Sequence, residues 1–365
     1  MRSDRWKEIA QRLEGWFARN QRDLPWRARY DPYEIWLSEV MLQQTRMEVV
    51  LVYYDRFLAR FPNLEALAQA AEEDVLAAWS GLGYYRRARA LREAARMVIE
   101  RHDGVMPDAV ELLRELPGIG RYTAGAVASI AHQRRTPVVE GNVTRLLARI
   151  DALEAPAGSA VLTRQLWDRA TRLVERAESP RNLNQAMMEL GALVCRPATP
   201  SCNECPVEDL CSARIAGRTG ELPRAGKRSQ SEALTIPLFI VEDARGNLLM
   251  RRERGALMTG MLHFPHGSDA LLDDCSESFA AGELIGSVRH TVTHRRIEFR
   301  VVAAQPRGAY LRETPGDYVW IDPGDIERFP HPSYVRKVLG LLESRRQKAE
   351  GRRQKAEGRR QKAEG

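Results

Sequence analysis

Four cysteines close together constrain this chain more than any other sequence feature. The 365 residues contain five cysteines, and four of them follow the spacing C-x6-C-x2-C-x5-C, at Cys195, Cys202, Cys205 and Cys211. Thiolates this close in sequence can surround one compact centre, which predicts a metal site in a reducing compartment rather than a disulfide framework. Four thiolates suit both zinc and iron–sulfur clusters, so the residue types leave the metal open. We expect the fifth, Cys275, to be an ordinary thiol.

The first 190 residues have a helical pattern without convincing strand alternation. Asp31-Pro32 predicts a helix start, because Asp caps a helix and Pro is favoured at its first position. Thr45 and Glu48 have the spacing of a capping box and predict a second start. Further helices are expected over 108–115, 121–132, 142–150 and 162–177.

The pattern changes after the cysteines. Residues 212–232 are polar, with glycines and basic side chains, and predict a linker. Alternating or continuous apolar runs then predict strands over 234–241, 247–250, 296–302 and 318–321, with a hairpin turn over 243–247. A closing helix over 333–342 completes an expected second domain of the α+β type.

A basic repeat ends the sequence and dominates its charge. Residues 345–365 are three copies of Arg-Arg-Gln-Lys-Ala-Glu-Gly, and the other 344 residues hold 47 basic against 46 acidic side chains out of the total of 56 and 49. The net charge of +7 therefore says little about what the folded part binds. We expect the repeat to be a solvated tail that is disordered or weakly helical. No run of 18 apolar residues predicts a membrane span, and the first eight residues lack the apolar core of a secretory signal.

Two carboxyl groups stand in different predicted environments. Glu39 has Ile35, Trp36 and Leu42 at helical spacing, so burial should raise its pKa and retain a proton. Glu140 stands just before a predicted helix start, where backbone N–H groups favour the ionised form. One retained proton and one anion are what cleavage of a glycosidic bond requires. The alternatives are a buried Glu39 paired with an arginine and a Glu140 that only caps a helix.

A glycine-containing turn precedes Glu140 by twenty residues. Leu116-Pro117-Gly118-Ile119-Gly120 joins two predicted helices, and its glycines permit positive φ and close approach of backbone N–H groups to a phosphate. The same pattern also occurs in ordinary helix connectors. Together with Glu140 and the cysteine spacing, however, it resembles the helix-hairpin-helix arrangement of iron–sulfur DNA glycosylases.

The chain is identified by these features as similar to the MutY family of adenine DNA glycosylases, over nearly everything except the tail. The matching motifs are Asp23-Leu24-Pro25-Trp26-Arg27, Trp36-Leu37-Ser38-Glu39-Val40-Met41-Leu42-Gln43-Gln44-Thr45, Gly81-Leu82-Gly83-Tyr84-Tyr85-Arg86 and Asn184-Gln185-Ala186-Met187-Met188-Glu189-Leu190-Gly191. The later part resembles the family's Nudix-like module over 248–265, at Arg289-His290-Thr291 and over 330–337. A Nudix box with clustered glutamates is absent from the sequence, so lesion reading without pyrophosphate hydrolysis is implied.

The resemblance implies a multi-domain protein. It places an all-α helix-hairpin-helix glycosylase domain with the iron–sulfur loop at 1–211, a linker at 212–232, an α+β Nudix-like C-terminal domain at 233–344 and the tail at 345–365. It implies one 4Fe-4S cluster on Cys195, Cys202, Cys205 and Cys211, and no nucleotide cofactor. The implied partner is double-stranded DNA containing adenine opposite 8-oxoguanine or guanine, with no membrane contact. We expect a monomeric, cytoplasmic, nucleoid-associated protein of the bacterial type.

The resemblance also implies a role for each site residue. Glu39 protonates the adenine base and later serves the attacking water, while Glu140 stabilises the sugar cation, with support from Tyr122 and Asn142. The residues implied to line the adenine pocket are Trp26, Arg27, Leu42 and Gln185. Those implied to contact 8-oxoguanine are Gln44, Tyr84, Thr293 and His294, and those implied to approach the DNA backbone are Gly118 and Gly120.

Three positions bear on the reaction type. Relatives that also cleave the strand have a lysine where this chain has Tyr122, so strong lyase activity is not expected. The family acid is aspartate where this chain has Glu140, and the family phenylalanine of the lesion loop is Val292. A mismatch-binding protein with lost or slow turnover, and a thymine or uracil mismatch glycosylase, are therefore the alternatives to an adenine glycosylase.

Overall fold

The computed structural model of the chain describes residues 4–226, 232–255, 259–267, 274–292, 295–307 and 318–364. Two compact units divide it: Met1–Ala70 with Arg86–Arg228, and Ala71–Tyr85 with Ser229–Gly365. The segment 71–85, expected in the helical domain, groups with the C-terminal residues. The helical unit also continues past position 211, because Ala213 and Leu222 of the expected linker pack with Cys211 in a small buried cluster.

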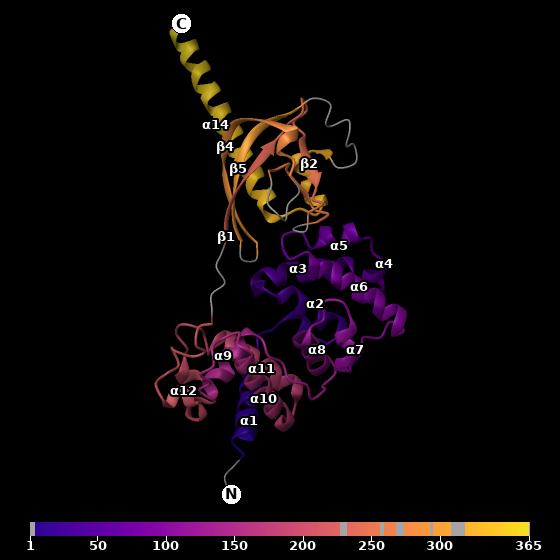
Figure 1. Ribbon diagram of the computed structural model, residues 1–365, viewed down its shortest axis with the longest axis vertical. Coiled ribbons are helices and arrows are strands. Elements are labelled where there is room, and N and C mark those ends of the chain that lie inside the picture. The colour runs from indigo at the N-terminus through magenta and orange to yellow at the C-terminus, as the bar shows by residue number, and fades with distance from the viewer. Residues whose placement is uncertain are drawn as a thin grey trace. The chain divides into compact units, whose positions relative to one another are not determined.

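Helices make up the first unit, as expected. In chain order they are α1 (Arg5–Asn20), η1 (Pro25–Arg27), α2 (Pro32–Leu42), α3 (Met47–Arg60), α4 (Leu64–Gln69), α6 (Arg86–Arg101), α7 (Val110–Glu115), α8 (Arg121–Ala126), η2 (Val127–Ala131), α9 (Gly141–Ile150), α10 (Ala160–Arg176), α11 (Pro180–Leu193), η3 (Cys202–Glu204), η4 (Glu208–Leu210) and α12 (Ser212–Ile215). Helix α2 contacts α3, α6 and α8, while α1, α9 and α10 all contact α11 (Figure 1). The segment η2 contacts both α2 and α11 and so joins the two groups.

Local sequence signals explain some helix boundaries and fail at others. Asp31 caps α2 as predicted, because its carboxylate accepts hydrogen bonds from the N–H groups of Tyr33 and Glu34. The helix start predicted at 45–48 is confirmed by α3, but the capping contact is wrong. Arg46 precedes α3 without a side-chain cap, and the Thr45 hydroxyl donates to the carbonyl of Gln43. The helix predicted over 121–132 also changes character, since η2 is a turn of π-helix that widens the backbone after α8.

The predicted hairpin joins α7 to α8. Gly118 has φ +76°, and a Cβ there would lie 2.7 Å from the Cβ of Ala90, so only glycine fits. Gly120 is different from what the turn pattern suggested, because its backbone is extended at φ −83° and ψ 177°. A Cβ added at Gly120 would meet no atom within 4 Å, so the space beside this residue is open.

Strands dominate the second unit, together with α5 (Glu72–Ala78) near its start. They are β1 (Glu232–Ile240), β2 (Leu248–Arg252), β3 (Leu262–His263), β4 (Phe279–Val292), β5 (Arg295–Pro306) and β6 (Tyr318–Ile321), with short 3-10 turns at Ser276–Ser278 and Pro323–Arg328. In the described residues β1 pairs parallel with β5, which pairs antiparallel with β4. A second sheet has the order β3-β2-β6, all antiparallel. The turn predicted before β2 is confirmed, since the N–H of Asn247 donates to the Asp243 carboxylate.

Strand β4 was not predicted from the sequence, although it is among the longest. Its pairing with β5 shifts register near Ala281 and again near Leu284, as β-bulges do. Each shift interrupts the two-residue alternation by which a strand is recognised in a sequence.

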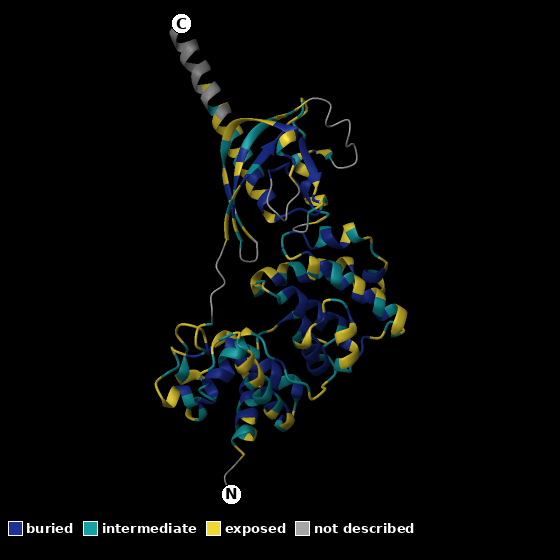
Figure 2. Ribbon diagram, in the orientation of Figure 1, coloured by how far each residue is buried: buried dark blue, intermediate teal, exposed yellow. Residues whose placement is uncertain are grey.

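The core of the second unit lies between the two sheets and α14 (Ser333–Glu364), whose Tyr334, Val335 and Val338 are fully buried (Figure 2). The expected helix therefore begins where predicted and continues through the repeat, for which disorder and weak helicity were both expected. Ala, Arg, Lys, Gln and Glu are all strong helix formers, so the repeat can extend a helix that packing has already started. No helix among the described residues has the length and apolar character of a membrane span.

Candidate active site

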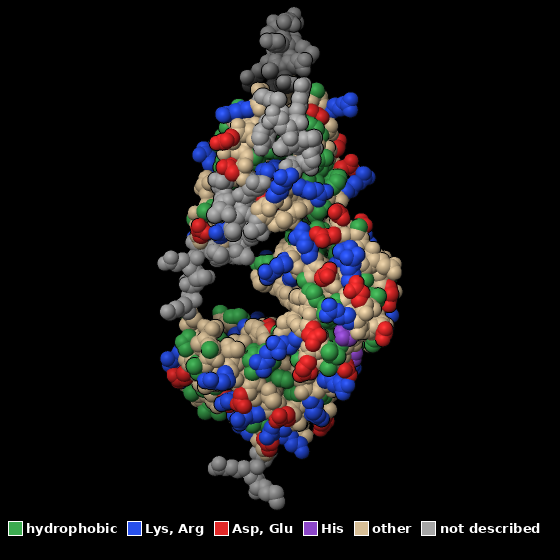
Figure 3. Space-filling model, turned by 45° about the vertical axis from the view of Figure 1, so that its right-hand side comes forward, with side chains coloured by type: hydrophobic (Ala, Val, Ile, Leu, Met, Phe, Trp, Pro, Cys, Tyr) green, Lys and Arg blue, Asp and Glu red, His purple; other side chains and the backbone are tan. Residues whose placement is uncertain are grey.

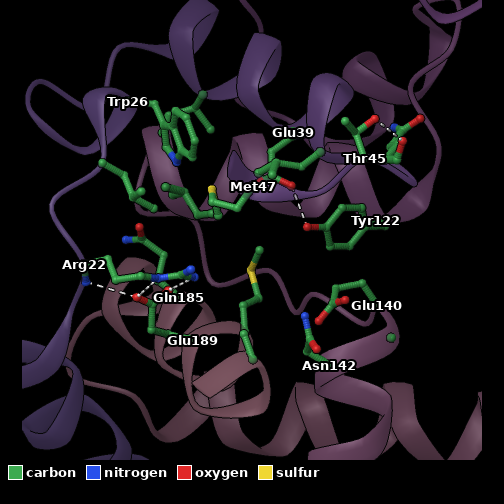
Figure 4. Close-up of a pocket in the computed structure, with 18 of the residues that line it drawn as sticks. Arg22, Trp26, Glu39, Thr45, Met47, Tyr122, Glu140, Asn142, Gln185 and Glu189 are labelled. Carbon is green, nitrogen blue, oxygen red and sulfur yellow. Dashed lines mark hydrogen bonds and ion pairs between the residues drawn. The ribbon is translucent and has the colours of Figure 1, made fainter. Parts of the chain in front are cut away.

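A cavity of about 620 Å³ in the helical unit collects most of the predicted site residues. Its wall comes from α2, α3, α8, α9 and α11 and from the segments that precede α2 and α3 (Figure 4). The predicted residues that line it are Trp26, Arg27, Glu39, Leu42, Gln44, Tyr122, Glu140, Asn142 and Gln185. A cavity of this size can enclose a small molecule or one extruded base.

Glu39 is a buried acid on a helix whose side chains are almost all buried. Only 4% of the residue is exposed, and the hydroxyl of Tyr122 donates a hydrogen bond of 2.5 Å to its Oε2. Burial raises the pKa of Glu39 to about 7, a rise that the hydroxyl of Tyr122 opposes. The alternative of a structural ion pair describes Glu34 of the same helix instead, since Glu34 pairs with Arg29.

Glu140 caps α9 and also faces the cavity. Its carboxylate accepts a hydrogen bond of 2.9 Å from the N–H of Val143. Burial nevertheless raises the pKa of Glu140, although backbone N–H groups at the start of α9 act to lower it. The sequence predicted an ionised Glu140 from its position at a helix start. That prediction was incomplete, because the residue is also buried and burial favours the protonated form.

The two carboxyl groups face one cavity, and Figure 4 shows Tyr122 between Glu39 and Glu140. The charge of Glu140 contributes to the raised pKa of Glu39, so ionising one acid disfavours ionising the other. The arrangement can therefore hold one proton and one negative charge at the same time, which is the division that glycosidic-bond cleavage needs.

The raised pKa of Glu39 has a consequence for stability. The folded state holds this proton up to about pH 7, whereas an unfolded glutamate releases it near pH 4.5. Stability is therefore lost as pH rises through that window, by up to about 3 kcal/mol. We expect Glu39→Gln to match the wild type in urea unfolding at pH 4.5 and to be more stable by about 1–3 kcal/mol at pH 8. A constant difference between the two proteins over this range would contradict the raised pKa.

A buried ion network borders the cavity. It was not predicted from the sequence. Glu189 accepts hydrogen bonds from Arg22 at 2.8 and 2.9 Å and from Arg27 at 3.0 Å. Arginine hydrogen bonds overcome its burial and lower the pKa of Glu189 to about 2. The Arg27 guanidinium also donates to Oε1 of Gln185, so the network fixes the direction of this pocket amide. The sequence did contain a signal for the position of Glu189. This residue follows the predicted pocket residue Gln185 by one helical turn, so both lie on the same face of the helix.

The other predicted site residues differ in their contacts, backbone conformation and exposure. Asn142 accepts a hydrogen bond from Arg145, which also donates to the carbonyl of Cys195. Gln44 and Tyr84 both have left-handed backbones, at φ +58° and +51°, and Tyr84 is 42% exposed. Thr293 and His294 lie outside the described residues.

The four clustered cysteines line one small cavity of about 20 Å³, as their spacing predicts. Apolar side chains of Leu146, Ile150 and Val194 share its wall. The buried guanidinium of Arg149 donates to the sulfur of Cys195 at 3.3 Å, a contact that suits a thiolate. This donor set fits a four-thiolate metal centre.

The surface charge agrees with the small net charge outside the tail. Figure 3 shows Lys and Arg side chains interspersed with Asp and Glu over the visible face of the helical unit. Attraction to an anionic partner must therefore depend on local groups rather than on a uniformly basic face.

Two family models match the chain. The first, described as HhH-GPD superfamily base excision DNA repair protein, matches residues 37–235, and a NUDIX domain model matches residues 238–341. These matches agree with an all-helical domain followed by a Nudix-like α+β domain.

The chain is also similar to curated proteins named adenine DNA glycosylase. It is 48% identical to the one from Rattus norvegicus, and the match covers 92% of this chain and 78% of that protein. It is 47% identical to the one from Homo sapiens, over 60% of this chain and 42% of that protein. The chain thus spans less than half the length of the human relative. A solved thermostable thymine-DNA glycosylase has a TM-score of 0.51 and 26% identity, covering 58% of this chain and 97% of that one.

Proposed function

Because the chain belongs to the HhH-GPD superfamily of base excision DNA repair proteins, and within it to the adenine DNA glycosylases, we propose that it hydrolyses the N-glycosidic bond of adenine mispaired with 8-oxoguanine or guanine in duplex DNA. The observation that carries the proposal is the convergence of Glu39, Tyr122 and Glu140 on one cavity. The nucleotide must leave the base stack to reach these groups, because a stacked base is inaccessible within the duplex.

Glu39 supplies the proton in the first step. With a pKa near 7, it is protonated in much of the population at neutral pH and can donate to a ring nitrogen of adenine. The bond between C1′ and the base then breaks, and its electron pair leaves with the base. The sugar becomes cation-like, and the Glu140 carboxylate stabilises that charge.

Water completes the reaction. It adds its oxygen to C1′ and gives a proton to the ionised Glu39, which returns the acid to its starting state. Tyr122 supports this cycle by donating to Glu39 when the acid is ionised. A strand-cleaving mechanism would need an amine to form a Schiff base with the sugar. Position 122 provides a phenol instead, so we propose a monofunctional enzyme.

DNA and cofactor binding follow from the remaining predicted residues. The turn at Gly118 and Gly120 leads into the start of α8, where backbone N–H groups suit a backbone phosphate. Cys195, Cys202, Cys205 and Cys211 would hold a 4Fe-4S cluster, which when bound would brace the loop between α11 and α12 and could exchange an electron.

A single-turnover assay with excess enzyme tests the proposal. Duplexes containing A:8-oxoguanine, A:G, T:G and A:T are compared, with and without alkali after the reaction. We expect adenine release from the first two and strand cleavage only after alkali. Thymine release from T:G without adenine release would assign the chain to the thymine mismatch enzymes instead. Tight binding to A:8-oxoguanine without base release would identify a mismatch-binding protein.

A further inference from the structure

A buried carboxylate and two buried imidazoles meet in the second unit. Glu253 directly follows β2, His263 ends β3, and His266 comes three residues later. They are 2%, 0% and 1% exposed. The Oε2 of Glu253 lies 3.0 Å from Nε2 of His263 and 3.1 Å from Nε2 of His266, and the three atoms lie within 4.8 Å of one another. None of them belongs to the cavity or the cysteine loop of the first unit.

The backbone fixes which nitrogen of each ring faces the carboxylate. Nδ1 of His263 is 2.7 Å from the carbonyl oxygen of Phe264, and Nδ1 of His266 is 2.7 Å from that of Gly267. A carbonyl oxygen only accepts hydrogen bonds, so both Nδ1 atoms must carry protons. In the neutral rings, Nε2 is then an unprotonated acceptor.

Three acceptors that converge in a buried space can be satisfied by one shared cation. One proton on one Nε2 satisfies one ring and leaves the other facing the carboxylate without a donor. Protons on both Nε2 atoms place two positive rings in a stack with a centroid separation of 4.6 Å. The Nε2 of His263 is also a buried atom without a hydrogen-bond partner in the structure, despite its closeness to Glu253. A single divalent ion satisfies all three groups together.

We propose that Glu253, His263 and His266 bind one Zn²⁺ ion. Imidazole nitrogen and carboxylate oxygen are ligands that zinc accepts, and a site without a redox role suits its filled d shell. Two ligand atoms around a tetrahedral zinc are about 3.3 Å apart, given bonds of about 2.0–2.1 Å. The observed separations of Glu253 Oε2 from the two Nε2 atoms, 3.0 and 3.1 Å, are within a few tenths of an ångström of this value, and the two Nε2 atoms lie within 4.8 Å of each other.

Neighbouring backbone groups orient the three proposed ligands in the way that is common at zinc sites. Ligating histidines commonly donate their other ring N–H to a backbone carbonyl, which is what both rings do here. The N–H of Gly255 donates to Oε1 of Glu253 and leaves Oε2 directed at the rings. The N–H of Glu253 also donates to the carbonyl of Met261, so the ion would hold together the two sides of the β2–β3 hairpin.

The test is metal analysis of the full chain expressed with zinc in the medium. A His263→Gln and His266→Gln double variant is compared with the wild type, and His290→Gln is the matched control, a partly buried histidine of the same unit that is not one of the three proposed ligands. We expect the double variant to contain about one zinc ion per chain less than the wild type and than His290→Gln. Since the four cysteines can also take up zinc, only this difference is assigned to the new site. Equal zinc in all three proteins overturns the proposal.

X-ray absorption at the zinc edge of the wild type gives a second readout that does not depend on how the variants fold. A shell of nitrogen and oxygen at about 2.0 Å with imidazole scattering supports the site. A shell of sulfur only, at about 2.3 Å, or the absence of zinc, overturns it and leaves a proton-bound cluster. Added Zn²⁺ should also raise the melting temperature of the wild type by more than that of a folded double variant, which keeps the four cysteines.

Discussion

Glu39→Gln will release adenine from an A:8-oxoguanine duplex about 10³–10⁴-fold more slowly than the wild type in single-turnover assays. The amide has nearly the shape of the acid and can still accept the hydrogen bond from Tyr122, but it has no proton to donate. Because the change is nearly isosteric, DNA binding measured by titration should remain within a few-fold of the wild type.

Glu34→Gln is the matched control for this experiment. Glu34 lies on the same helix and is buried to a similar degree, with 6% exposed, but it pairs with Arg29 and does not line the cavity. We expect this variant to lose some stability and to retain base release within a few-fold. Equal losses of base release in both variants would mean that Glu39 acts through the packing of α2 and not through its proton.

The pH profile provides an independent check on Glu39. As a proton donor with a pKa of about 7, it should make single-turnover base release fall as pH rises above neutrality, approaching about tenfold per unit. The acidic side of the profile reports the protonation of Glu140, whose pKa is also raised. A rate that stays constant from pH 7 to pH 9 would exclude Glu39 as the acid.

The second large effect concerns the glutamate that replaces the family aspartate. We expect Glu140→Gln to slow base release by about 10²–10³-fold, because it removes the negative charge that we propose stabilises the sugar cation. We expect Glu140→Asp to remain within about tenfold of the wild type. Aspartate can accept the same hydrogen bond from the N–H of Val143 that holds the present carboxylate.

The two substitutions are measured side by side under single-turnover conditions, with thermal unfolding to separate lost capping from lost charge. Loss of a cap alone costs about 1 kcal/mol and would lower the melting temperature without a matching loss of rate. If Glu140→Asp is as slow as Glu140→Gln, carboxylate placement matters more than charge. If Glu140→Asp is much faster than the wild type, the longer side chain misplaces the acid, as a shift of about 1 Å is enough to do.

Several site features could be predicted because they depend on neighbours in sequence. Ile35, Trp36 and Leu42 around Glu39 indicated its burial, and α2 places it in the core. The spacing of the cysteines indicated one shared cavity. Position 140 before a helical pattern indicated a cap, which the structure contains. These depend on helix period, chain length and local capping, which act within a few residues.

Other features depend on residues far apart in the chain. The burial that raises the pKa of Glu140 and the two arginines that hold Glu189 come from separate elements. The same is true of the meeting of Glu253 with two histidines across a hairpin. The long strand β4 was missed because its bulges break the local alternation.

The sequence by itself therefore indicated a helical part followed by a strand-rich part, the place of Glu39 on α2, the place of Glu140 at the start of α9, and the grouping of four cysteines. Only the tertiary structure decided how far each acid is desolvated, which side chain contacts it, and which distant residues share a site. The physical reason is the distance over which each effect acts. Helix propensity, helical periodicity and capping depend on residues that are near neighbours in sequence. Desolvation and charge coupling depend on every group that folding brings within a few ångströms.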